Sequence, residues 1–398
     1  MEKSHETKTR TRIAGFLVAG VAAGALALAA PAWAQATVNF SQATPMNKAR
    51  AFFTANDIPD GKILVAGGYD GSCQCAPNFA DSEIYDWQTG VWTPTTAMNS
   101  ARAAAVSVTL RGGRVLVIGG FDENFNVLDS AEIYDSHHAT WTLTAPMNDA
   151  RAEDFTAIVI SNGDDGSDTR VLVAGGTGSD GVSSLNSAEI YDVNTNTWTP
   201  TGSMNVGRGE FASIKLQDGG VLAVGGIASD GTPIASAEIY NPARGVWTLT
   251  GSMRTARNDL QAVRLLDGRV LVAGGGTGSE DNPRLSSAEI FIPSQGRWKA
   301  TGDMTTPRSE AEHATLYLPD GHVLVPGGLT QPHTATASTD LYNNENHTWS
   351  AVAPLSEPRS GHSALVAYGK PGFAIVIGGL DQGDAATASV DLGQLVDR

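Results

Sequence analysis

The chain has 398 residues and a formal net charge of −16, with 42 acidic side chains against 26 lysines and arginines. A body this acidic lacks the basic surface that binds phosphate backbones, so we exclude nucleic acid as a partner. The length suits about two or three ordinary domains, or one array of repeats in which each unit buries its faces against its neighbours.

The N-terminus has the pattern of a secretory leader. Arg10 and Arg12 precede a long apolar run that ends in the small-x-small sequence 32–34. This arrangement predicts cleavage by signal peptidase after residue 34, with Ala36 as an alternative position. We therefore expect residues 1–34 to be a secretory signal peptide and the mature protein to be secreted or periplasmic, with no membrane attachment. The alternative is a retained membrane anchor.

Seven copies of one pattern fill the rest of the chain. Their consensus reads Met-x-x-Ala-Arg, an apolar run, a tight turn, a second apolar run ending in Gly-Gly, a variable loop, Ser-Ala-Glu-Ile-Tyr-Asp and then Trp. Steps between copies range from 49 residues (Met98 to Met147) to 57 residues (Met147 to Met204). The copies are anchored at Met46, Met98, Met147, Met204, Met253, Met304 and Leu355.

Each copy contains four strand-like runs. The second, such as 115–118, is continuously apolar, which suits a strand covered on both faces. A turn such as Asp60-Gly61 precedes it and supplies the positive φ angles of a hairpin. The third run contains Glu-Ile-Tyr (132–134) and the fourth begins near Trp141. The copies therefore predict seven blades of four antiparallel strands.

The last copy stops after its third strand. In the other copies an aromatic residue precedes the next anchor by six positions, and Phe40 stands at that distance from Met46. We therefore expect residues 37–41 to supply the missing fourth strand and to close the ring, which removes an exposed sheet edge. The predicted fold is all-β: residues 35–398 form a single seven-bladed β-propeller.

The Gly-Gly pairs, each followed by a Tyr-like and then a Trp position, resemble kelch repeats. The pairs are 67–68, 119–120, 175–176, 225–226, 274–275, 327–328 and 378–379. The resemblance covers residues 37–393 and implies a kelch propeller with the central propeller fold of galactose-oxidase-like proteins. Such propellers include extracellular sugar oxidases, a periplasmic sialic acid epimerase and many protein-binding modules, so the resemblance implies a fold more than an activity.

One arginine and one acid recur in each copy. The arginines lie on what we call the upper side, which carries the Met-x-x-x-Arg segments and the loops after Gly-Gly. The resemblance implies that this side binds ligands. Two interpretations stay open: structural ion pairs, or arginines that bind a ligand carboxylate. The arginines are Arg50, Arg102, Arg151, Arg208, Arg257, Arg308 and Arg359. The acids are Glu83, Glu132, Glu189, Glu238, Glu289, Asp340 and Asp391.

Additional acids stand next to these arginines and argue against a free positive patch. They are Glu153, Asp154, Glu210, Asp259, Glu310 and Glu312.

Aromatic residues that are not shared between the copies of the repeat form a second candidate site. Tyr69 and Phe79 belong to the upper loop of the first copy, and Phe121 and Phe125 to that of the second. Rings beside carboxylates and amides can stack on a sugar and bind its hydroxyl groups. The alternative is that the rings anchor the loops by packing. We predict a ligand patch formed by these two blades.

The two cysteines and two of the histidines are further candidates for a disulfide or a metal site. Cys73 and Cys75 form a disulfide in our prediction, with inert thiols or a soft-metal site as alternatives. His313 and His362 follow repeat arginines, where a packed histidine is favoured over a metal pair. We predict no metal site and no cofactor.

The copper-radical oxidases of the kelch family use a Tyr-His pair and a Tyr-Cys cross-link. This chain has no Tyr-His dipeptide, and both cysteines fall in one loop. The epimerase resembles a six-bladed disc, whereas this chain has seven copies of the repeat. We therefore predict a monomeric, non-catalytic binding module for an extracellular or periplasmic protein or glycan. The alternative is a sugar-acting enzyme, epimerase- or oxidase-like, with its site in the upper funnel; a deep funnel with an acid–base pair would favour it.

Overall fold

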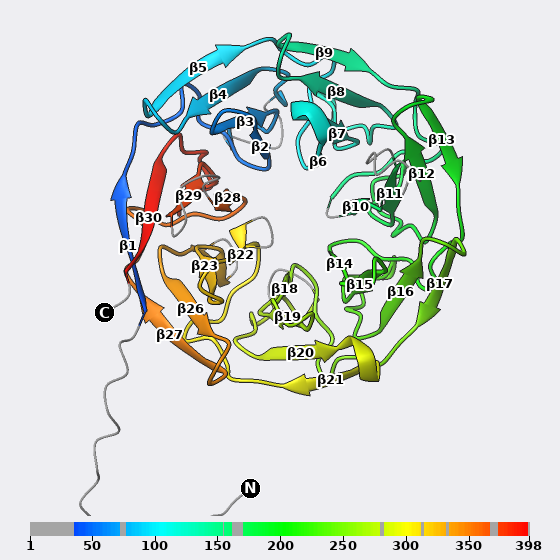
Figure 1. Cartoon of the computed structure of the whole chain (residues 1–398), viewed down its shortest axis with the longest axis vertical. Coiled ribbons are helices and arrows are strands. Elements are labelled where there is room, and N and C mark those ends of the chain that lie inside the picture. Colours follow the sequence, from blue (N-terminus) through cyan, green and yellow to red (C-terminus); the bar gives the residue numbers. More distant parts are fainter. Residues whose placement is uncertain are drawn as a thin grey trace, which may run out of the picture. The chain divides into compact units, whose positions relative to one another are not determined.

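Seven four-stranded antiparallel sheets stand in a ring (Figure 1). The computed structural model describes residues 36–71, 77–153, 155–160, 170–278, 282–311, 314–331, 334–366 and 373–396. These residues all belong to one compact unit, Ala36–Arg398. The predicted leader, residues 1–34, lies outside the described residues. Within the described part of the chain, no helix is long and apolar enough to cross a membrane.

The blades follow one another in chain order, and each runs outward from the centre of the ring. Blades 1 to 3 comprise β2 (Thr54–Ile58), β3 (Lys62–Ala66), β4 (Ser82–Asp86) and β5 (Val91–Thr95); β6 (Val106–Leu110), β7 (Arg114–Ile118), β8 (Ala131–Asp135) and β9 (Thr140–Leu143); β10 (Thr156–Val159), β11 (Arg170–Ala174), β12 (Ala188–Asp192) and β13 (Thr197–Pro200). Blades 4 and 5 comprise β14 (Ala212–Lys215), β15 (Val221–Val224), β16 (Ala237–Asn241) and β17 (Val246–Leu249); β18 (Gln261–Arg264), β19 (Val270–Ala273), β20 (Ala288–Ile292) and β21 (Arg297–Ala300). Blades 6 and 7 comprise β22 (Leu316–Tyr317), β23 (Val323–Pro326), β26 (Thr339–Asn343) and β27 (Thr348–Val352); β28 (Ser363–Val366), β29 (Phe373–Ile377), β30 (Val390–Val396) and β1 (Thr37–Gln42).

Three short features complete the described part of the chain. Strands β24 (Leu329–Gln331) and β25 (Thr334–Ala335) form a ribbon in the upper loop of blade 6. The one-turn 3-10 helices η1 (Arg111–Gly113) and η2 (Pro293–Gln295) lie in turns between strands. The predicted all-β, seven-bladed propeller is confirmed.

The second strand of each blade supplies the core on both of its faces. In β7, Val115 and Val117 pack in one cluster with Leu64 of blade 1, while Leu116 packs in another with Val171 of blade 3. Successive side chains of a strand point to opposite faces, so a strand between two blades must be apolar at every position. This explains the continuous apolar runs in the sequence.

The Gly-Gly pairs mark the closest approach between neighbouring blades. Gly68 has a φ of 88°, and a Cβ at this position would lie 2.6 Å from the carbonyl oxygen of Ala51. A Cβ on Gly67 would lie 2.4 Å from the carbonyl oxygen of Arg102, in the next blade. Glycine is therefore required both for the left-handed backbone and for the contact. In all seven blades the second glycine donates its N–H to the carbonyl of the next blade's repeat arginine, at 2.8–3.0 Å.

The ring is closed by β1, as predicted from Phe40. This strand pairs with β30 from Thr37 opposite Val396 to Gln42 opposite Asp391. Val38 is only 1% exposed. It packs in the cluster shared by blades 6 and 7, beside residues such as Leu355 and Val376.

Val38→Asp should destabilise the propeller by about 3–5 kcal/mol, because it places a carboxylate in this apolar cluster. Asn39→Asp is the matched control, since Asn39 lies on the same strand with its side chain exposed. Urea unfolding monitored by tryptophan fluorescence measures both. Equal midpoints for the two variants would show that β1 does not hold the ring closed.

Asp57, on the innermost strand of blade 1, gives the fold a pH dependence. Burial raises the pKa of this carboxyl from 3.8 to about 6. The folded state therefore carries the cost of the ionised group above about pH 6, and that cost vanishes below about pH 4, where both states are protonated.

Asp57→Asn should consequently raise the free energy of unfolding at about pH 7.5 by about 1 kcal/mol, a figure discounted because the side chain is only half-buried. At about pH 3.5 the same substitution should have no effect. Urea unfolding at the two pH values checks this, and a gain of the same size at both would contradict the raised pKa.

Candidate functional site

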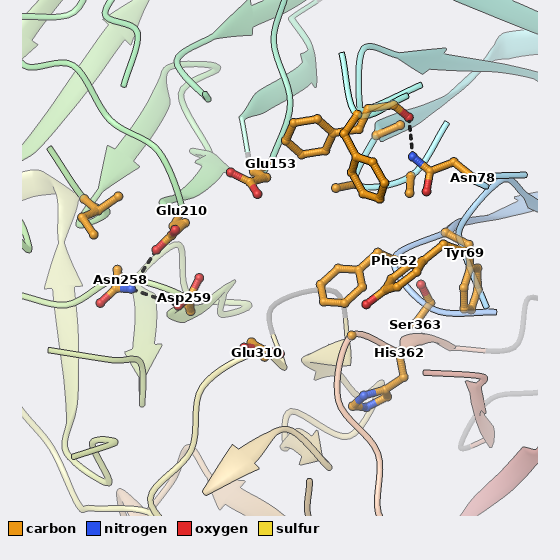
Figure 2. A pocket seen from close by; sticks show the side chains of 18 of the residues that line it. Phe52, Tyr69, Asn78, Glu153, Glu210, Asn258, Asp259, Glu310, His362 and Ser363 are labelled. Atoms are coloured by element: carbon orange, nitrogen blue, oxygen red, sulfur yellow. Dashed lines mark hydrogen bonds between the residues drawn. The ribbon is translucent and has the colours of Figure 1, made fainter. Parts of the chain in front are cut away.

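A pocket of about 820 Å³ opens on the upper side, and residues from all seven blades line it (Figure 2). Its size falls in the range typical of ligand sites in proteins. The pocket therefore surrounds the axis of the ring. It is built from the segments that follow the repeat arginines and from the loops that follow Gly-Gly.

The residues two positions after the repeat arginines form a ring in the pocket wall, and we call them the rim residues. They are Phe52, Ala104, Glu153, Glu210, Asp259, Glu310 and Gly361. All seven have a positive φ, between 46° and 56°. Backbone bonds join neighbours, such as the N–H of Phe52 to the carbonyl of Gly361 at 3.0 Å and the N–H of Ala104 to that of Phe52 at 2.9 Å. The backbone thus sets where each rim side chain begins.

Four of the rim residues are acids from consecutive blades, and we call them the acidic arc. They are Glu153, Glu210, Asp259 and Glu310, which lie along one side of the cavity in Figure 2. Hydrogen bonds hold three of these carboxylates. Thr177 donates to Glu153 at 2.8 Å, and the Nδ2 of Asn258 donates to Glu210 at 2.8 Å and to Asp259 at 2.9 Å.

The opposite side of the pocket is aromatic, and we call it the aromatic arc: Phe52, Tyr69, Phe121 and Phe125. The rings of Phe52 and Tyr69 lie 5.9 Å apart. Phe125 lies outside the blade core, and 43% of it is exposed. Burial, and then the negative charge of Glu310, raise the pKa of Tyr69, so its hydroxyl stays a neutral donor.

Three of the four aromatic residues predicted as a ligand patch therefore line the pocket. Phe79 does not line it: its ring is buried, and the Nζ of Lys48 lies 3.4 Å from the ring centroid. Lys48 in turn forms an ion pair with Asp81 at 2.7 Å. Phe79 thus matches the alternative that the sequence left open, a loop anchor held by packing and a cation–π contact.

The seven repeat arginines lie inside the blades and not in the pocket wall. None is more than 1% exposed, and each forms an ion pair with the acid of its own blade at 2.5–3.4 Å. In blade 4, Arg208 also donates to the carbonyls of Gly225 and Ser236, both at 2.9 Å. Burial lowers the pKa of Arg208 and Glu238 opposes that shift. A ligand carboxylate would have to break such a pair to reach the guanidinium.

Several predicted residues lie outside the described residues: Cys73, Cys75, Asp154, Glu312 and His313. His362 is described, and it lies in the pocket wall, 1% exposed, with its Nε2 3.1 Å from the carbonyl oxygen of Pro326. Among the residues that the structure describes, no three His, Cys, Asp or Glu side chains are placed to hold a metal ion.

Sequence reasoning missed Phe52, Asn258 and Arg284, which all line the pocket. Phe52 stands at a position that differs between the copies, so the residues that the copies share do not mark it. At the position after the repeat arginine, Asn258 replaces the Ala, Gly or Ser of the other copies. Listing what varies at these two positions would have found Phe52 and Asn258. Arg284 lies in an irregular loop, where no repeat position marks it.

Comparison with known proteins supports the repeat. The kelch motif matches residues 102–148, 166–205 and 261–305. Beta-scruin of Limulus polyphemus is 33% identical over 108 residues, which is 25% of this chain and 11% of beta-scruin.

Solved structures resemble this one in fold. A fungal alcohol oxidase in complex with copper superposes with a TM-score of 0.69 at 17% identity, covering 91% of this chain and 76% of the oxidase. YjhT superposes with a TM-score of 0.60 at 14% identity, covering 78% of this chain and 99% of YjhT.

Seven four-stranded blades around one axis define a β-propeller. Three segments of this propeller carry kelch motifs, and its fold resembles that of galactose-oxidase-like kelch proteins. Kelch propellers are general scaffolds that commonly bind proteins.

The buried pairs predict a large effect on stability. Glu238→Ala should lower the free energy of unfolding by about 3–5 kcal/mol, because it leaves the guanidinium of Arg208 buried without its counter-ion. Glu123→Ala, at an exposed position of an upper loop, should change it by less than about 0.5 kcal/mol. Urea unfolding compares them. An unchanged midpoint for Glu238→Ala would reopen a ligand-binding role for the arginines.

Proposed function

We propose that the protein is an exported, monomeric binding module that holds a protein or glycan ligand in the upper pocket. The leader pattern of residues 1–34 supports export. The kelch motifs support a binding role, because kelch propellers commonly bind proteins. The alternative is a sugar-acting enzyme with its site in the same pocket.

The aromatic arc is the observation that carries this proposal. Its rings belong to loops and to the rim, whereas the aromatic residues of the repeat pack inside the blades. In blade 2, for example, the ring of Tyr134 lies 5.0 Å from that of Trp141. Phe125 keeps 43% of its surface exposed at the pocket and has a φ of 61°, which is unfavourable for a bulky residue. Exposed aromatic side chains in a concave site are typical anchors for ligands.

The test is a glycan array and a pull-down from exported proteins, run in parallel with the wild type and two variants. Phe125→Ala should reduce ligand capture at least about tenfold, because it removes an aromatic anchor. Leu249→Ala is the matched control: it removes an apolar side chain that is 54% exposed on β17, and should capture ligand like the wild type.

Thermal unfolding should show that both variants fold, since both side chains are substantially exposed. Equal capture by Phe125→Ala and Leu249→Ala would refute the pocket as the binding site. Capture of nothing specific by the wild type in either arm would refute the binding role itself.

A further inference from the structure

The pocket has two chemically different halves. The acidic arc comes from blades 3 to 6, and the aromatic arc comes from blades 1 and 2 (Figure 2). One cation, Arg284, also lies in the wall, beside Gly276 and Asn258. Four carboxylates against one guanidinium leave a formal charge of −3 on the lining.

The carboxylates of the arc are not required by the architecture. Every blade adopts the same left-handed backbone at the rim, yet the other three rim positions hold Phe52, Ala104 and Gly361. Glycine is the residue that this backbone accepts without strain, so the backbone conformation itself does not call for an acid there. The acids are therefore a property of the pocket and not of the repeat.

The acceptors of the arc are held in place before any ligand arrives. Asn258 is 2% exposed, and its Oδ1 accepts the N–H of Gly278 at 3.1 Å, which fixes the orientation of the amide. Its Nδ2 then holds both Glu210 and Asp259. Acceptors that are already ordered bind a donor at a smaller entropic cost.

An independent observation on the other side of the pocket also points to a donor. Asn78 lies in the pocket wall and is 5% exposed. Its Nδ2 donates to the carbonyls of Phe121 and Asp122 at 2.9 and 2.7 Å, so its Oδ1 is fixed as an acceptor. That oxygen is buried and has no hydrogen-bond partner among the residues that the structure describes. An unsatisfied buried acceptor is costly and is satisfied by an N–H or O–H group.

We propose that this pocket binds the side chain of an arginine or lysine presented by a partner protein. The inference rests on the binding function proposed above and names the group that is bound. Such a side chain has an apolar stem, which fits against the aromatic arc, and a cationic head, which fits the acidic arc. The hydroxyl groups of a neutral glycan can also donate to the carboxylates, but without the positive charge that makes the hydrogen bonds of a guanidinium or ammonium group to a carboxylate stronger. The net charge of −16 also attracts a basic partner over a distance.

The experiment uses three blocked pentapeptides, acetyl-Gly-Gly-X-Gly-Gly-amide, in which X is arginine, lysine or citrulline. Citrulline has nearly the shape of arginine without its charge. Calorimetric titration of the full protein should show binding of the arginine or lysine peptide, and at least about tenfold weaker binding of citrulline. Affinity for the charged peptides should fall as salt rises from about 0.05 to 0.5 M.

Glu210→Gln and Glu310→Gln each remove one negative charge from the arc with little change in shape. Each should weaken binding of the charged peptides at least about threefold and leave citrulline unaffected. Glu345→Gln is the matched control. It makes the same charge change at an exposed position in the turn between β26 and β27, which does not line the pocket, and should bind like the wild type. Thermal unfolding confirms that each variant folds.

Equal affinity for arginine and citrulline, no binding of any of the peptides, or variants of the arc that bind like Glu345→Gln would each overturn the proposal. If the array instead yields a neutral glycan whose capture depends on Phe125, the cationic ligand is wrong and the binding function stands. If capture does not depend on Phe125 either, both proposals fail.

Discussion

The buried guanidinium of the repeat arginine is the constraint on which the ring depends. In blade 4, Arg208 pairs with Glu238 and donates to the carbonyl of Gly225, so one side chain joins three segments of its own blade. Its own carbonyl accepts the N–H of Gly176 from the preceding blade at 2.8 Å. A buried charge is stable only when its counter-ion and hydrogen bonds are all present. The recurring pattern of arginine, Gly-Gly and acid in this chain is therefore one structural unit.

This unit also explains why the pocket can differ from blade to blade. The arginine fixes the backbone, and two residues later the chain reaches the rim in the same left-handed conformation in every blade. The rim residues do not belong to the core clusters of the blades, and residues as different as Phe52, Gly361 and Glu210 occupy equivalent positions in different blades. Chemistry is thus placed by substitution on a repeated frame, with positions held by the backbone.

Much of the fold could be predicted from the sequence because its signals are local. The apolar runs, the turns and the six-residue spacing of Phe40 from Met46 all indicate strands and their pairing. The site was harder to predict. Of the four aromatic residues in the predicted ligand patch, Tyr69, Phe121 and Phe125 line the pocket, whereas Phe79 lies beneath Lys48. Sequence alone does not tell in which direction a loop side chain points.

By itself the sequence determined the number of blades, which equals the number of copies, and the order of the strands, which follows from the apolar runs and turns within each copy. It also determined the closure of the ring, because Phe40 stands at the repeat spacing from Met46. Only the tertiary structure decided which residues line the pocket. The ring brings equivalent positions together around one axis, so Glu153 and Glu310, far apart in the chain, meet at one pocket. The tertiary structure also decided between the two interpretations of the repeat arginines, because it buries each of them beside the acid of its own blade.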